Sequence, residues 1–147
     1  MIKVPKLTLE DAKVGIESAK KKASEIGVPM DIAVVDEAGN ILTFERMDGG
    51  LVGSIQIAID KAYTAAVLGL PTGEEGKIAQ PGGPDYGINS TCNGRIVIFA
   101  GGVPVKLNKL VIGAVGCSSG TVEEDTAVAE AGVIAIEAQV RAQAEQS

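Results

Sequence analysis

The feature that most constrains the fold is a pair of apolar segments lying too close together in the chain to be joined by a helix. Met30–Asp36 (MDIAVVD) and Ile41–Met47 (ILTFERM) are rich in residues that favour strands, and only the turn-forming EAGN separates them. A connection this short joins antiparallel strands, because parallel strands need a crossover of about a dozen residues or more. The sequence therefore predicts an antiparallel sheet.

Three further strands are expected in the second half of the chain. They are Arg95–Ala100 (RIVIFA), Val103–Leu107 (VPVKL) and Lys109–Cys117 (KLVIGAVGC), and Gly101-Gly102 supplies the turn between the first two. Pro104 has no N–H to donate, so its strand should lie at an edge or carry a bulge. Together with the hairpin, these segments predict a five-stranded sheet.

Three helices complete the pattern. The first begins after an N-cap at Thr8 and ends at Gly27, with apolar residues spaced by three and four. The second runs from about Ser54 to Leu68 and the third from about Val122 to Ala144. The order α-β-β-α-loop-β-β-β-α, over 147 residues, predicts a single α/β domain of the α+β type spanning residues 1–147, with its antiparallel sheet covered by helices.

The connection between Leu70 and Gly94 is long and rich in glycine and proline, as PTGEEGKIAQPGGPDYG shows. A structureless stretch of this length inside a domain is typically a functional loop or a lid. A surface excursion or a contact between subunits explains it equally well.

Charge and composition exclude several function classes. The formal net charge is -6 and aromatic residues make up 3% of the chain, which is unfavourable for binding phosphate backbones or stacking bases, so no nucleic-acid partner is expected. The N-terminal residues lack the pattern of a secretory leader, and no apolar run is long enough to span a bilayer. With only two cysteines, we expect a reduced, cytoplasmic protein without membrane contact.

The chain contains no histidine. Histidine is the commonest metal ligand and the usual acid–base group near neutral pH. Its absence rules out zinc sites of the Cys/His type, Ser-His-Asp triads and haem held by an imidazole, and no metal site is expected.

Lys61 is the most informative residue. On a helical projection of residues 54–68 it falls within an apolar arc, beside Ile57, Ala65 and Leu68. Burying a lysine alone is costly, so its ammonium must reach water, pair with a carboxylate or meet an anionic ligand.

Two further charged residues end the strand before this helix. Arg46 shares a face with Leu42 and Phe44, and Asp48 follows at the strand end. Arg46, Asp48 and Lys61 are therefore our candidate ligand-binding residues, with the arginine as a bidentate fork, the lysine as a point charge and the aspartate as an orienting group. The alternative is a structural ion pair between Asp48 and Arg46 or Lys61.

Other candidate motifs have structural interpretations. GAVGCSSG matches no phosphate-binding loop, and Thr121 with Glu124 has the spacing of a capping box. Cys92 has no accompanying base, and Cys117 fits a small core residue. The last helix is apolar over more than one face, which favours a homo-oligomer.

These segments together resemble a known family. The run IAVVDEAGNILTFERMDG, then KAYTAA, then GGVPV and VIGAVGCSSGTVEEDTAVAEAG are similar to the GlcG/HbpS-like family, which includes the C-terminal domain of PduO-type proteins. The resemblance implies a profilin-like fold with a five-stranded antiparallel sheet, higher oligomers, and a haem-binding or haem-degrading label. Without histidine, haem iron would need Cys, Met, Tyr or Lys as a ligand, or no axial bond.

Three functions stay open at this point. The first is a protein that binds a small molecule or cofactor-like anion through Arg46 and Lys61, as an accessory to a catabolic pathway. The second is an enzyme acting on a small carboxylate, with Lys61 and Asp48 as its acid–base pair. The third is an oligomeric accessory protein without a ligand. Haem bound without histidine is a variant of the first.

Overall fold

Four strands form one antiparallel sheet in the order β2-β1-β4-β3. The computed structural model describes residues Met1–Ser147. The strands are β1 (Asp31–Asp36), β2 (Ile41–Arg46), β3 (Gly102–Leu107) and β4 (Leu110–Ser118). The helices are α1 (Leu9–Ile26), α2 (Ser54–Leu68), α3 (Thr72–Ile78) and α4 (Val122–Gln146), and two 3₁₀ turns are η1 (Ile88–Ser90) and η2 (Cys92–Gly94). This confirms an α+β domain with an antiparallel sheet.

The prediction of a fifth strand at Arg95–Ala100 was wrong. This segment is attached to α2 instead of the sheet: the Val97 amide donates to Thr64 Oγ1 over 3.0 Å, and that hydroxyl lies 3.2 Å from the Arg95 carbonyl oxygen. A side chain of α2 thus accepts from a backbone amide that a neighbouring strand would otherwise pair. The sheet ends at β3, where Pro104 lies at the predicted edge.

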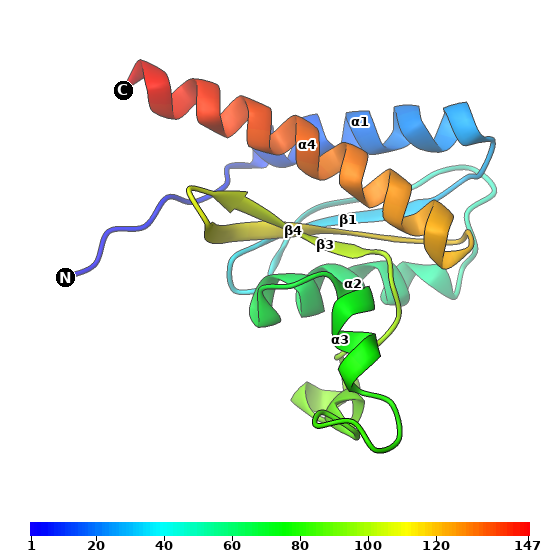
Figure 1. The fold of residues 1–147 in the computed structure, drawn as a ribbon. Helices are drawn as coiled ribbons and strands as arrows, with labels where there is room; N and C mark the ends of the chain where they lie inside the picture. The colour runs from blue at the N-terminus through cyan, green and yellow to red at the C-terminus, as the bar shows by residue number, and fades with distance from the viewer.

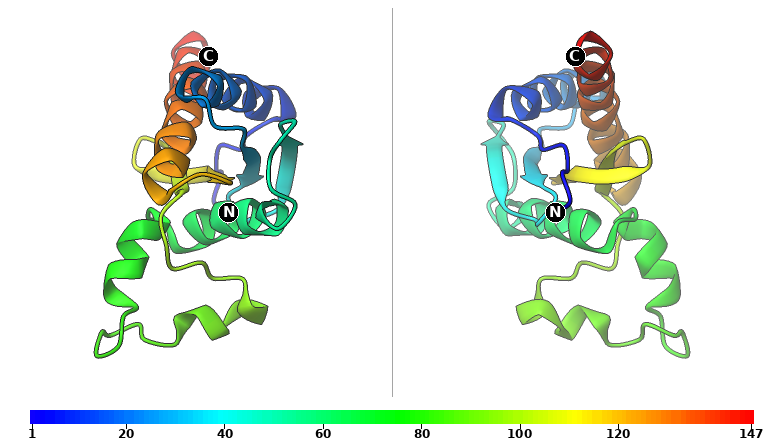
Figure 2. Two further views of the ribbon diagram at one scale, coloured as in Figure 1. Left: turned by 90° about the vertical axis from the view of Figure 1, so that its right-hand side faces the viewer. Right: turned by 90° about the vertical axis from the view of Figure 1, so that its left-hand side faces the viewer.

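The composition suggested a structureless connection between Leu70 and Gly94, but the structure has helical elements there. The connection contains α3 and both 3₁₀ turns. Figures 1 and 2 show that α3 and the following turns extend from the sheet and its helices as an arm. We call residues 71–100 the arm.

The helix starts follow the sequence closely. Thr8 and Thr121 each accept a hydrogen bond from the backbone amide of the third residue of their helix. In return, the carboxylates of Asp11 and Glu124 accept one from the backbone amide of the cap residue. These reciprocal bonds satisfy amides that have no partner within a helix. The capping boxes therefore set where α1 and α4 begin, and the capping box predicted at Thr121 and Glu124 is confirmed.

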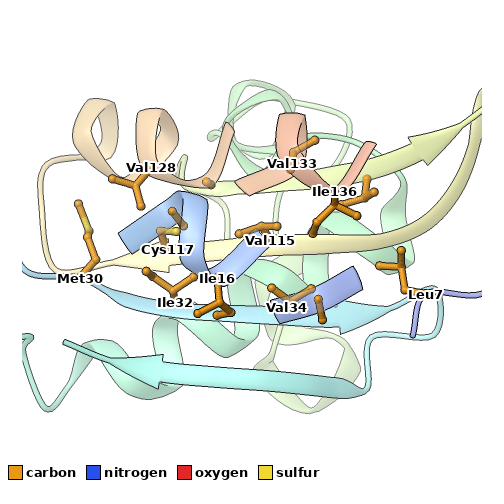
Figure 3. Packing of buried hydrophobic residues seen from close by; sticks show 14 of the residues in the cluster. Leu7, Ile16, Met30, Ile32, Val34, Val115, Cys117, Val128, Val133 and Ile136 are labelled. Atoms are coloured by element: carbon orange, nitrogen blue, oxygen red, sulfur yellow. The ribbon is translucent and has the colours of Figure 1, made fainter. Parts of the chain in front are cut away.

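Helices cover both faces of the sheet. Figure 2 shows α1 and α4 on one face and α2 on the other. The main core lies beneath α1 and α4, and Figure 3 shows Ile32, Val34 and Val115 of the sheet meeting Ile16 and Ile136 of those helices. Cys117 is part of this core, as predicted. No helix of the structure is both long enough and apolar enough to cross a membrane.

The face under α2 is packed through very small residues. Ala58, Ala62 and Ala65 of α2 are fully buried, and Gly116 of β4 lies directly beneath the helix backbone. A Cβ added at Gly116 would overlap the Ala58 carbonyl oxygen and the Ala62 amide nitrogen. The close approach of α2 to β4 therefore requires glycine at this position.

We expect Gly116→Ala to lower the free energy of unfolding by about 3 kcal/mol, because neither backbone can move without disturbing the core. Gly53→Ala is the matched control, since a Cβ there meets nothing within 4 Å. Urea unfolding monitored by circular dichroism measures both. Equal stabilities for the two variants would contradict the packing described here.

Candidate functional site

Lys61 lies entirely inside the protein, with 0% of its side chain exposed. Its position in the apolar arc of α2 directs it inward, as the sequence predicted. The ammonium bonds Asp125 Oδ2 at 2.8 Å and the Cys117 carbonyl oxygen at 3.0 Å. The ring of Phe99 lies over it, with its centroid 5.0 Å from Nζ, a distance suited to a cation–π contact.

Asp125 reaches Lys61 from the first turn of α4. Its second oxygen, Oδ1, accepts a 2.9 Å hydrogen bond from the Gly120 amide in the turn between β4 and α4. Burial raises the pKa of Asp125, and the Lys61 ammonium and the Gly120 amide offset only part of that effect. The carboxylate thus joins three elements: α2, the end of β4 and α4.

The carboxylate partner of Lys61 is therefore Asp125 and not Asp48, which corrects the pairing considered from the sequence. Asp48 is exposed in the turn after β2. Because Lys61 and Asp125 are both buried, neither reaches solvent as a free acid or base. In this arrangement the pair has no access to a substrate.

Arg46 lies elsewhere. It ends strand β2, where its register partner on β1 is Asp31, and its side chain is exposed. Burial raises the pKa of Asp31, and the charge of Arg46 partly counteracts that rise. No hydrogen bond or ion pair joins Arg46 or Asp48 to Lys61, and β1 separates β2 from the β4 strand that Lys61 contacts. The structure does not bring the three residues together, and ligand contact by Arg46 and Asp48 stays a prediction.

A hollow of about 370 Å³ lies between α2 and the later part of the arm. Its walls are mainly apolar, and Asp60, Gln56 and Asn89 add polar groups. The lining residues are Gln56, Ile57, Asp60, Asn89, Gly94, Ile96, Val97, Ile98 and Phe99. Its size and mixed lining are typical of small-molecule sites. Phe99 connects the hollow to Lys61, because the ring that lines it also covers the ammonium.

An arginine lies at the edge of this hollow. Arg95 stands between the lining residues Gly94 and Ile96, and its Nε donates to Asp60 Oδ1 over 2.9 Å. Its guanidinium carbon lies 3.8 Å from the centroid of the Tyr63 ring. The remaining N–H groups of the guanidinium form no hydrogen bond within the chain and are suited to a carboxylate.

Potential iron ligands near the hollow are few. Cys92 is exposed, and burial raises the pKa of the Tyr63 hydroxyl. The structure contains no group of three or more His, Cys, Asp or Glu side chains placed to hold a metal ion. Among the side chains here, a cysteine thiolate or a tyrosinate could ligate haem iron.

Sequence reasoning missed Arg95 and the hollow. It treated Arg95 as the first residue of a strand, so its side chain had no assigned neighbour. Asp60 and Tyr63 lie three residues apart on the polar side of α2, and that spacing was the available signal, because it places a carboxylate and an aromatic face together. Which arginine would meet them depended on the path of the arm.

Residues 7–134 match the family model described as "Haem degrading protein HbpS-like". The chain belongs to the HbpS-like family. This confirms the family suggested by the sequence motifs.

Two curated relatives illustrate the family. The chain is 49% identical over 124 residues to an uncharacterized 15.0 kDa protein in the dhaT-dhaS intergenic region of Citrobacter freundii, covering 84% of this chain and 87% of the relative. It is 32% identical over 130 residues to the corrinoid adenosyltransferase PduO of Salmonella typhimurium, covering 88% of this chain. It spans only 39% of that PduO.

Solved structures share the fold. The protein ORFY of Klebsiella pneumoniae matches with a TM-score of 0.91 and 41% identity, covering 94% of this chain and 95% of that one. A PduOC:heme complex matches with a TM-score of 0.85 and 31% identity, covering 89% and 95%. HbpS matches with a TM-score of 0.81 and 28% identity, covering 91% and 92%.

Breaking the Lys61–Asp125 pair should strongly destabilise the protein. We expect Asp125→Asn to lower the free energy of unfolding by about 3 kcal/mol, because it leaves a buried ammonium without a counter-charge. Asp60→Asn is the matched control: its partner Arg95 is 35% exposed, so its loss should cost less than about 1 kcal/mol. Chemical denaturation compares the two, and similar small losses would contradict a structural role for the buried pair.

Proposed function

We propose that this protein binds a planar, largely apolar small molecule with a carboxylate edge, of the tetrapyrrole class, in the hollow between α2 and the arm. The observation that carries the proposal is the hollow itself. Ile57, Ile96, Ile98 and Phe99 line it, and Arg95 stands at its edge with free hydrogen-bond donors. Apolar side chains can pack against the faces of a ring, and a guanidinium can hold its carboxylate.

The proposal keeps an anionic ligand, as the sequence suggested, but assigns the anion to Arg95. Lys61 is then a positioning residue, since its ammonium lies beneath the Phe99 ring and has no exposed surface. The Asp60 carboxylate accepts a hydrogen bond from Arg95 Nε and so orients the guanidinium. The ligand would thus meet Phe99 and Arg95, and Lys61 would act through Phe99.

Two relatives support the tetrapyrrole class. One structural neighbour is a haem complex of PduOC, and the curated relative PduO is a corrinoid adenosyltransferase. Haem and corrinoids are both tetrapyrrole-derived macrocycles, so the shared chemistry is the ring. The adenosyltransferase activity is not part of the proposal, because this chain spans 39% of PduO.

Haem held in this hollow would have no imidazole ligand, because the chain contains no histidine. Cys92, in the same turn as the lining residue Gly94, and Tyr63, which stacks on Arg95, carry the groups that would be candidates for iron ligands. The apolar walls and Arg95 do not depend on the metal. We therefore propose that binding rests on the macrocycle and its carboxylates.

Titration with haemin, metal-free protoporphyrin IX and cobalamin tests the proposal. We expect saturable binding of at least one macrocycle at one per chain, with haemin and protoporphyrin IX within about tenfold of each other. Phe99→Ala and Ile57→Ala should each weaken binding at least tenfold, because each removes part of an apolar wall. Absorbance and tyrosine fluorescence provide the readouts.

Tyr86→Ala is the control for the loss of an aromatic ring, since Tyr86 lies on the arm, is 69% exposed and lines no hollow. It should bind like the wild type. The absence of saturable binding by any of the three macrocycles would overturn the proposal, and so would equal weakening by Tyr86→Ala and Phe99→Ala.

Other expectations stay predictions. Homo-oligomerisation is consistent with exposed apolar side chains such as Val52 (73% exposed) and Ile134 (66% exposed). A cytoplasmic location and a role as an accessory to a catabolic pathway remain part of the proposed function.

A further inference from the structure

A second pair of acidic residues lies within the arm. Glu75 of α3 is only 3% exposed, and its Oε1 has no hydrogen-bond donor within reach. Its carboxyl group meets the Asp85 carboxyl group, which lies in the turn after α3, within hydrogen-bonding reach. Two ionised carboxylates are both acceptors, so this contact is a hydrogen bond only if a proton lies between them. A proton shared with Asp85 would give this buried carboxyl group a hydrogen bond that it otherwise lacks.

No cation neutralises this pair. On α3 itself, Lys77 is engaged with Glu74 at 2.9 Å, and both side chains are largely exposed. The segment Ile96–Ala100, which packs against Gly76, contains no titratable side chain.

The neighbouring elements offer no counter-charge either. On α2, Lys61 is bonded to Asp125, and Asp60 to Arg95. Lys106, the charged residue of β3, is exposed. Asp85 is thus the charged group that acts on Glu75.

Burial and the Asp85 carboxylate raise the pKa of Glu75 to about 7 from an ordinary value near 4.5. A carboxyl group whose pKa is higher in the folded state stabilises that state below its unfolded pKa. The stabilisation is lost as the pH rises through the folded pKa. The stabilisation of the contact between α3 and the following turn should therefore fall as the pH rises above about 4.5, and it should be lost once the pH passes about 7.

We propose that Glu75 and Asp85 form a proton-operated latch, in which one shared proton holds the turn at residues 79–87 against α3 and loss of that proton releases it. The turn has few other attachments to α3. The Asp85 amide donates to the Ile78 carbonyl oxygen over 3.0 Å, and Gln80 Nε2 donates to the Gly76 carbonyl oxygen over 2.8 Å. Deprotonation places two negative charges close together, and one of them lies on the buried Glu75 side chain.

The latch lies next to a wall of the arm. Gly76 packs so closely on the Ile98 carbonyl that a Cβ there would overlap it. Ile98 and Phe99 line two hollows. Gly76 and Gln80 also line one of these hollows. A change in α3 would therefore reach residues that shape both hollows, although the latch itself operates without a ligand.

Hydrogen–deuterium exchange on the ligand-free protein tests the latch. Exchange is followed from pH 5.5 to pH 8.5, with exposure times scaled to the intrinsic rate at each pH. In the wild type, we expect amides of residues 79–88 to lose about tenfold in protection between pH 6 and pH 8, while the sheet stays protected. Glu75→Gln should remove this step, because an amide donates to Asp85 at every pH.

Two further variants make the result decisive. Asp85→Asn should also remove the step, and it tests the latch independently if Glu75→Gln fails to fold. Glu74→Gln alters the adjacent exposed glutamate and should keep the wild-type profile. The latch is overturned if wild-type protection does not change with pH, or if the step persists in both Glu75→Gln and Asp85→Asn. Because no ligand is present, either outcome leaves the tetrapyrrole proposal untouched.

Discussion

The buried ion pair between Lys61 and Asp125 is the constraint on which the rest of the structure depends. The ammonium belongs to α2, on one face of the sheet, and the carboxylate belongs to α4, on the other face. They meet beside the end of β4, where the Cys117 carbonyl and the Gly120 amide complete their hydrogen bonds. A buried charge must be compensated, so this pair fixes how both helices meet one end of the sheet.

The position of the pair also organises the candidate binding region. Phe99 covers the ammonium, and the same ring lines the hollow next to α2. The segment that carries Phe99 forms no sheet hydrogen bonds and is attached to Thr64 of α2. Its side chains are consequently free to form walls of a hollow, with Arg95 at the edge. A structural charge pair and a ligand hollow thus share one aromatic ring.

Much of this fold could be predicted from local sequence signals. The EAGN turn, the capping threonines and the proline at an edge strand each act over a few residues, and the structure confirmed all three. The burial of Lys61 followed from helical periodicity. Its partner did not, because Asp125 lies 64 residues away in sequence and nothing local distinguishes it from Asp48. The path of the arm was harder still to predict. Arg95–Ala100 has the composition of a strand, but its backbone is hydrogen-bonded to a side chain of α2.

We infer that Lys61 is a fully buried structural cation that contacts no ligand. Labelling the native protein with an amine-reactive reagent, followed by peptide mass spectrometry, measures this directly. Lys61 should stay unlabelled until the protein unfolds, while exposed lysines such as Lys13 and Lys77 should react readily. Labelling of Lys61 in the folded protein at a rate similar to that of Lys77 would contradict it.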